Sequence, residues 1–205
     1  MASILKVDTI QDQSGNNIIN ESGDTITIGA SGDTITVPTG ATLTVPNGGL
    51  SGQNYPAFFA TMSADQTGVL DSTFTKIQFD SERFDTDSAY DATTNYRFTV
   101  PTGLGGKYFF SSRVYVDGVS SSQTFSNIDY AFYINGSQNV YSGYNFVNYS
   151  PKAYNVSVNA VLDLSAGDYV ESYIYSDTPS GATFVINQNN TTLARCFWYG
   201  YRIGD

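Results

Sequence analysis

Apolar and polar residues alternate along most of this chain, and apolar residues at helical spacings of three and four are nowhere sustained. Alternation of this kind predicts strands that bury one face. Turn residues separate the alternating segments that follow residue 56. We expect strands at Ala57–Met62, Phe74–Phe79, Tyr96–Val100, Tyr108–Val116, Ile128–Ile134, Val140–Asn148, Ala153–Leu162, Tyr169–Tyr175, Thr183–Asn187 and Ala194–Ile203. So many short strands with regular turns predict an all-β fold, with a C-terminal jelly-roll sandwich of about ten strands.

A short repeat precedes the sandwich. Ser22–Ile28, Ser31–Val37 and Gly40–Val45 each combine a turn with a short alternating strand. Threonines occupy one side of these strands, and the other side carries the apolar residues Ile26, Ile28, Ile35, Val37, Leu43 and Val45. Three short strands bury too little to be stable alone. We therefore expect residues 22–46 to form a β-repeat shaft in which three chains cover the apolar row around a three-fold axis. The alternative is a small hairpin or meander docked on the sandwich.

The parts on either side of the shaft differ in character. Residues 1–21 contain few apolar residues and no evident partner strand in the same chain, whereas residues 47–54 are rich in glycine and read as a linker to a head domain at 55–205. The N-terminal segment resembles the leading segments of structural proteins in tailed bacteriophages, especially cyanobacterial phages. That resemblance implies an arm that attaches to the virion through Ile4, Leu5, Val7 and Ile10. The alternative is a disordered terminus.

The head carries several motifs in a constant order. They are Tyr96–Pro101, Gly106–Phe110, Tyr133–Gly136, Leu162–Val170 and Cys196–Ile203. Together they resemble the globular head of the complement and tumour-necrosis-factor superfamily. The resemblance implies a ten-stranded jelly roll that assembles as a tight homotrimer. Asn135-Gly136 between two apolar runs independently predicts a β-hairpin.

Tyrosine is unusually abundant, with 16 residues in a chain of 205. Tyrosine suits interfaces because a large apolar ring ends in a polar group. One face of the last strand must enter the core, and we expect the other face to line the three-fold axis. The candidate interface residues are Phe197, Tyr199 and Tyr201, with Tyr108 and Phe110 nearby.

A second group of aromatic and amide residues lies in the segment after the Asn-Gly turn. Rings stack on sugars and amides bond their hydroxyls, so this segment is a candidate contact with a host surface glycan. Its residues are Tyr141, Tyr144, Asn145 and Tyr149. The alternative, which we favour, is a core or interface strand.

Charge and chemistry narrow the possible functions. The net charge is −10, which disfavours nucleic-acid binding, and the chain has no histidine and only one cysteine, Cys196. Catalytic triads, cysteine-based zinc sites and intrachain disulfides are therefore excluded. We expect no cofactor, no metal and a buried Cys196. An acidic cluster could supply a carboxylate pair or calcium ligands, but we interpret it as a solvated loop. Its members are Asp80, Glu82, Asp85, Asp87 and Asp91.

These patterns indicate a non-enzymatic structural protein of the virion. Met1–Ile10 contains no long apolar run, so we expect neither a signal peptide nor membrane insertion. The favoured function is a trimeric phage fibre, on the tail or the head, exposed on the particle surface with a host-contacting tip. Its partners would be two further copies, other virion proteins and a candidate host glycan. The alternative is a capsid decoration protein. A glycan-cleaving enzyme and a secreted adhesin are less favoured.

Overall fold

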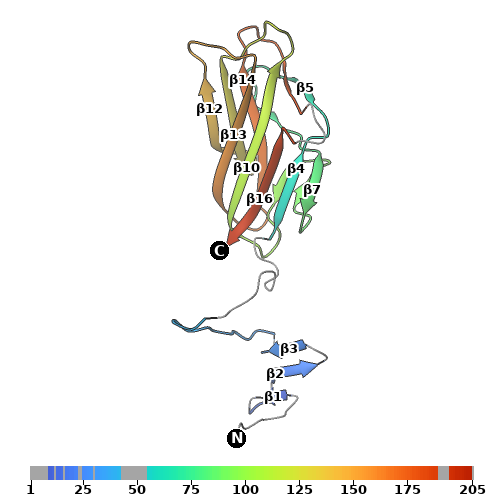
Figure 1. Ribbon diagram of the computed structural model, residues 1–205, viewed down its shortest axis with the longest axis vertical. Coiled ribbons are helices and arrows are strands. Elements are labelled where there is room, and N and C mark those ends of the chain that lie inside the picture. Colours follow the sequence, from blue (N-terminus) through green and yellow to red (C-terminus); the bar gives the residue numbers. More distant parts are fainter. Residues whose placement is uncertain are drawn as a thin grey trace. The chain divides into compact units, whose positions relative to one another are not determined.

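The protein divides into two compact units, Met1–Ser51 and Gly52–Asp205, which we call the N-terminal unit and the head unit. The computed structural model describes residues 9–11, 13–15, 17–22, 25–29, 31–42, 55–188 and 194–204. Every regular element in those ranges is a β-strand (Figure 1), which confirms the predicted all-β class. No helix suited to crossing a membrane is found in this part of the chain.

The N-terminal unit is a three-stranded antiparallel sheet. Its strands are β1 (Thr9–Gln11), β2 (Asn17–Ser22) and β3 (Thr25–Ile28), in that order across the sheet. The expectation that residues 1–21 have no partner in their own chain is wrong, because Ile10 lies opposite Ile19 in the β1–β2 pair. Two turns bring this segment back on itself.

The repeat is realised only once as a strand. β3 is the strand of the first repeat, whereas residues 31–42 form turns and extended chain without strand pairing. The expected strands of the second and third repeats are thus wrong for the described residues, because no neighbouring segment offers them backbone hydrogen bonds. Leu43 and Val45, like Ile4, Leu5 and Val7, lie outside the described residues.

The head unit contains two antiparallel sheets (Figure 1). In the first, which we call the β10 sheet, the long strand β10 lies at the centre. One edge of β10 pairs with β13, and its other edge pairs with β16 and then with β15. The strands of this sheet are β4 (Ala57–Thr61), β5 (Gln66–Val69), β7 (Ser81–Asp85), β10 (Gly106–Gly118), β13 (Ala153–Leu164), β15 (Phe184–Ile186) and β16 (Phe197–Gly204).

The second sheet, which we call the β11 sheet, has the order β12-β11-β14-β9-β8, with β6 also paired to β14. Its strands are β6 (Thr75–Lys76), β8 (Tyr90–Asp91), β9 (Arg97–Thr99), β11 (Asn127–Ile134), β12 (Ser137–Asn145) and β14 (Tyr169–Asp177). Neighbouring strands come from distant parts of the chain, and the first and last strands of the head unit, β4 and β16, pair with each other. This order makes the head unit a jelly-roll sandwich. The strands β5, β7 and β8 were not anticipated from the sequence.

The Asn-Gly turn forms the predicted hairpin between β11 and β12. Asn135 and Gly136 both have positive φ angles, 51° and 78°, as a two-residue hairpin of this kind requires. The Asn135 side chain also bonds both the carboxylate and the backbone of the neighbouring β13–β14 turn, through Asp168 and the N–H of Tyr169. One turn thus holds the other.

The core between the sheets is dense in aromatic rings. Trp198 on β16 and Phe58 on β4 meet edge to face at 5.2 Å, and Phe58 stacks on Tyr90 at 4.8 Å. The close packing explains Gly200, because a Cβ there would lie 2.5 Å from a ring carbon of Phe110. Both sheets therefore bury one face completely, and their functional surfaces are their outer faces.

A chain of buried hydroxyl groups crosses this core from one sheet to the other. Ser172 on β14 donates to the Tyr130 hydroxyl on β11 at 2.8 Å, and Tyr130 bonds the Ser112 hydroxyl on β10. Ser112 in turn donates to the carbonyl of Phe197 on β16 at 3.0 Å. Each polar group in this line has a partner, so the chain ties the two sheets together without leaving a buried hydroxyl unsatisfied.

Candidate interaction surfaces

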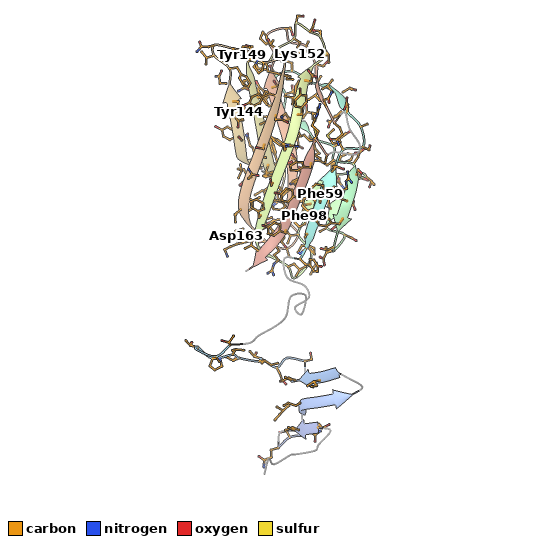
Figure 2. All side chains as sticks on the ribbon, viewed as in Figure 1. Phe59, Phe98, Tyr144, Tyr149, Lys152 and Asp163 are labelled. Carbon is orange, nitrogen blue, oxygen red and sulfur yellow. The ribbon has the colours of Figure 1, made fainter. Side chains whose placement is uncertain are left out.

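The outer face of the β10 sheet carries a band of aromatic rings, which we call the aromatic face. Its members are Phe59, Phe84, Phe109, Phe197, Tyr199 and Tyr201. Strand register brings them together: Phe84, Phe59 and Tyr199 lie opposite one another across β7, β4 and β16, and Tyr201 lies opposite Phe109 of β10. Figure 2 labels Phe59 on β4. Four strands thus contribute to one continuous surface.

The rings of the aromatic face contact one another. The centroid of Phe59 lies 5.9 Å from those of Phe197 and Tyr199, and Phe109 lies 5.5 Å from Tyr201. These are ordinary aromatic contact distances. Phe84 remains 52% exposed. A contiguous apolar surface of this kind on a soluble domain marks an interaction site.

The prediction for the last strand and that for β10 fare differently. Phe197, Tyr199 and Tyr201 lie on the outer face of the sheet, where an interface would need them. The placement of Tyr108 and Phe110 at an interface is wrong, because both are fully buried in the core. The neighbouring Phe109 takes the outer position instead. Both faces of β10 are aromatic at this point, so hydrophobic pattern alone could not decide which residues point outward.

The predicted glycan-contact residues do not come together as one site. Tyr141 and Asn145 lie on the outer face of the β11 sheet, whereas Tyr144 faces the other way and packs on Tyr154 of β13 at 5.0 Å. Tyr149 is 77% exposed in the loop between β12 and β13, at one end of the head unit (Figure 2). The alternation of a single strand explains this split, because neighbouring residues point to opposite faces.

A second aromatic cluster lies on the outer face of the β11 sheet, and we call it the tyrosine face. Its members are Phe74, Tyr133, Tyr141, Tyr173 and Tyr175. Phe74 lies 5.1 Å from Tyr175 and 5.8 Å from Tyr133, and Tyr133 lies 4.2 Å from Tyr173. The sequence reasoning missed all but Tyr141. The available signal was the alternation of Tyr169–Tyr175, whose odd-numbered positions carry aromatic residues opposite a buried row.

The acidic cluster organises turns. Asp85 accepts hydrogen bonds from the backbone N–H groups of Ala89 and Tyr90 at 3.1 and 2.8 Å. The backbone N–H groups of Thr94 and Thr93 hold the pKa of the Asp91 carboxyl well below its usual range. In the ranges that the structure describes, no group of three or more carboxylate, histidine or cysteine side chains is placed to hold a metal ion.

Cys196 is buried, as expected. Burial raises the pKa of its thiol to about 11, so the group is a neutral thiol at physiological pH. The backbone N–H of Tyr115 points at its Sγ atom, 3.4 Å away. Cys196 thus fills space under the β10 sheet, and a nucleophilic role has no support from its environment.

The head unit is similar to solved structures at low sequence identity. The globular domain of zebrafish complement 1qA protein aligns with a TM-score of 0.47 and 17% identity, over 73% of this chain and 98% of that one. Murine APRIL at pH 5.0 aligns with a TM-score of 0.47 and 10% identity, over 71% of this chain and 97% of that one. Eiger TNF from S. frugiperda aligns with a TM-score of 0.45 and 11% identity, over 73% and 91%.

These likenesses concern the fold alone. They include complement and tumour-necrosis-factor proteins, the superfamily that the sequence motifs resemble. No protein-family model matches the sequence, and no curated protein matches it. The description of the head unit as a jelly-roll sandwich rests on its own strand pairing.

Proposed function

We propose that this chain is the structural subunit of a trimeric fibre on a tailed-bacteriophage particle, with a head unit that contacts the host. The observation that carries the proposal is the aromatic face, a surface of stacked rings on an otherwise acidic and polar chain. The resemblance of the N-terminal segment to phage structural proteins supplies the particle. The proposed role is structural and needs no catalytic group or cofactor.

A second copy of the chain is the occupant that fits the aromatic face. Within Ala57–Thr61, Lys107–Arg113 and Phe197–Tyr201 the outward charges are few, with Arg113 lying over the Phe197 ring at 4.8 Å. Cores of protein interfaces are similarly depleted of charge and enriched in aromatic residues. Four phenylalanines are too apolar to remain in water on a stable surface, and other copies of the chain are always available to cover them.

The N-terminal unit presents the same problem on a smaller scale. Ile26 is 68% exposed and Ile35 is 64% exposed, and Ile10, Ile28 and Val37 are exposed as well. This unit offers these side chains no core of its own. A three-fold assembly would cover the isoleucines of the N-terminal unit and the aromatic faces of the heads with a single symmetry, which is why we favour three copies over a dimer of heads.

Electron cryomicroscopy of intact particles, combined with immunogold labelling of this chain, tests the assignment. We expect density at the tail or as fibres that project from the head, with the head unit distal. Distribution over the shell between capsomers would favour a decoration protein over a fibre. Absence of the chain from purified particles would overturn both assignments.

A further inference from the structure

The tyrosine face has the chemistry of a carbohydrate platform, and it differs from the aromatic face in composition. It consists of four tyrosines and one phenylalanine on β11, β12, β14 and the loop before β6. Its rings are half-buried except for Tyr141, which is 65% exposed. Half-burial fixes the rings while leaving one side of the cluster open to a ligand.

The rings are held in place by their neighbours on the sheet. Tyr173 contacts Tyr133 at 4.2 Å, and the Lys76 ammonium lies 5.8 Å from the Tyr173 ring centroid. Lys76 is itself fixed by an ion pair with Glu171 at 2.5 Å. Burial raises the pKa of the Tyr133 and Tyr173 hydroxyls, so both keep their protons and can donate hydrogen bonds at physiological pH.

Acceptor groups flank the rings on one side. Asp129 of β11 lies directly opposite Tyr175 in the strand register, and Asn127 lies two residues away on the same face. A Cβ at Gly143 would lie 2.3 Å from the Asp129 carboxylate, so the glycine makes room for that group. The only hydrogen bond found for Asp129 is a long one of 3.4 Å from Asn127, and the buried Asn127 Oδ1 has no donor. This end of the tyrosine face has unused acceptor capacity.

We infer that the tyrosine face binds a neutral, hydroxyl-rich saccharide, with rings of Tyr173 and Tyr175 against the sugar and Asp129 accepting from its hydroxyls. This inference rests on the proposed function, in which the head unit contacts a host surface. Tyrosine rings supply an apolar surface for sugar C–H groups, and carboxylates accept from hydroxyl donors.

Charge decides between classes of occupant. The Lys76 charge is already paired with Glu171, whereas the structure shows no cationic partner for Asp129. Sulfated, phosphorylated or uronic-acid glycans would therefore meet repulsion from Asp129 and from a chain of net charge −10. A flat protein partner would bury Asp129 and leave that charge unpaired, which is costly. A neutral sugar instead supplies hydroxyl donors and leaves the rest of the carboxylate in water.

A glycan array of neutral hexose oligosaccharides, with sulfated and uronic-acid oligosaccharides printed beside them, tests this inference on the full chain. We expect binding to one or more neutral probes, unchanged between low and physiological salt because no charge pairing is involved. Tyr173→Ala and Asp129→Asn should each weaken that binding by about tenfold or more, equivalent to about 1.4 kcal/mol. Tyr149→Ala, which removes an exposed tyrosine away from this face, is the matched control and should bind as the unmodified chain does.

The outcomes separate this inference from the proposed function. If the chain labels host cells but binds no neutral probe, or if Tyr173→Ala binds normally, the saccharide site is wrong while host contact stands. Binding only to anionic probes, lost in high salt, would likewise overturn it. If the chain is absent from particles and does not label host cells, the proposed function itself fails. Thermal unfolding of Tyr173→Phe, which keeps the ring, checks that lost binding does not reflect lost folding.

Discussion

Replacing Tyr130 by phenylalanine should destabilise the head unit although it removes a single oxygen atom. The Tyr130 hydroxyl is fully buried and stands in the middle of the hydroxyl chain, where it accepts from Ser172 and bonds Ser112. Its loss breaks two hydrogen bonds between different strands. Ser112 keeps its bond to the Phe197 carbonyl, whereas Ser172 loses the only partner found for its hydroxyl.

The magnitude follows from these contacts. Two hydrogen bonds contribute about 1 kcal/mol each, and a buried hydroxyl without a partner costs about 1–3 kcal/mol. We expect Tyr130→Phe to lower the free energy of unfolding by about 2–4 kcal/mol. Urea unfolding followed by Trp198 fluorescence, at one protein concentration for all variants, measures this change. Trp198 reports on the head unit because it lies in the core next to Phe58.

A second substitution isolates the cause. In Tyr130→Phe/Ser172→Ala no orphaned hydroxyl remains, so the double variant should lose at least about 1 kcal/mol less than the sum of the two single variants. Burial raises the pKa of the Tyr130 hydroxyl above its unfolded value near 10. Its stabilising effect is therefore present below pH 10 and is lost as the pH rises further, and Tyr130→Phe should weaken that alkaline loss. A change in unfolding free energy below about 0.5 kcal/mol, or strict additivity of the two substitutions, would refute this reasoning.

Three further substitutions test other parts of the structure. Gly200→Ala places a Cβ against the Phe110 ring and should cost about 1–3 kcal/mol of stability by overpacking, measured by the same urea unfolding; an unchanged midpoint would mean that the ring moves freely. Asp91→Asn should remove the stability that is lost as pH falls below about 4, because the pKa of Asp91 is lowered in the fold; comparing melting temperatures at pH 7 and pH 3 checks this, and an identical fall in both proteins would contradict it. Ile26→Asp with Ile35→Asp should leave Trp198 fluorescence native but make the N-terminal unit sensitive to protease, and equal resistance would mean that these side chains are not covered in the assembly.

Much of the head unit was predictable because its strands alternate clearly. The expected strand at Tyr108–Val116 corresponds to β10, and that at Tyr169–Tyr175 corresponds to β14. The Asn135-Gly136 hairpin was predictable because its turn residues are compatible with positive φ angles. The expected strand at Phe74–Phe79 shrinks to Thr75–Lys76, because only these residues find a partner on β14. Pairing depends on distant segments, which local pattern does not contain.

The interaction surfaces were less predictable for a related physical reason. The alternation of β10 reveals two faces but not which one meets the opposite sheet, so Tyr108 and Phe110 were expected at an interface and are buried. The tyrosine face combines residues from four separate segments, and only strand register brings Phe74 to Tyr175. A site that is built across strands leaves no contiguous motif in the sequence.

The central claim, that the aromatic face is covered by other copies of this chain, is tested most directly by the mass of the full chain in solution. Multi-angle light scattering at micromolar concentration should give three times the 22.2 kDa chain mass. Tyr199→Glu, which puts a charge at the centre of the aromatic face, should reduce the mass of the assembly or leave it dependent on concentration. A monomer of the unmodified chain under these conditions, with the aromatic face in water, would contradict the account.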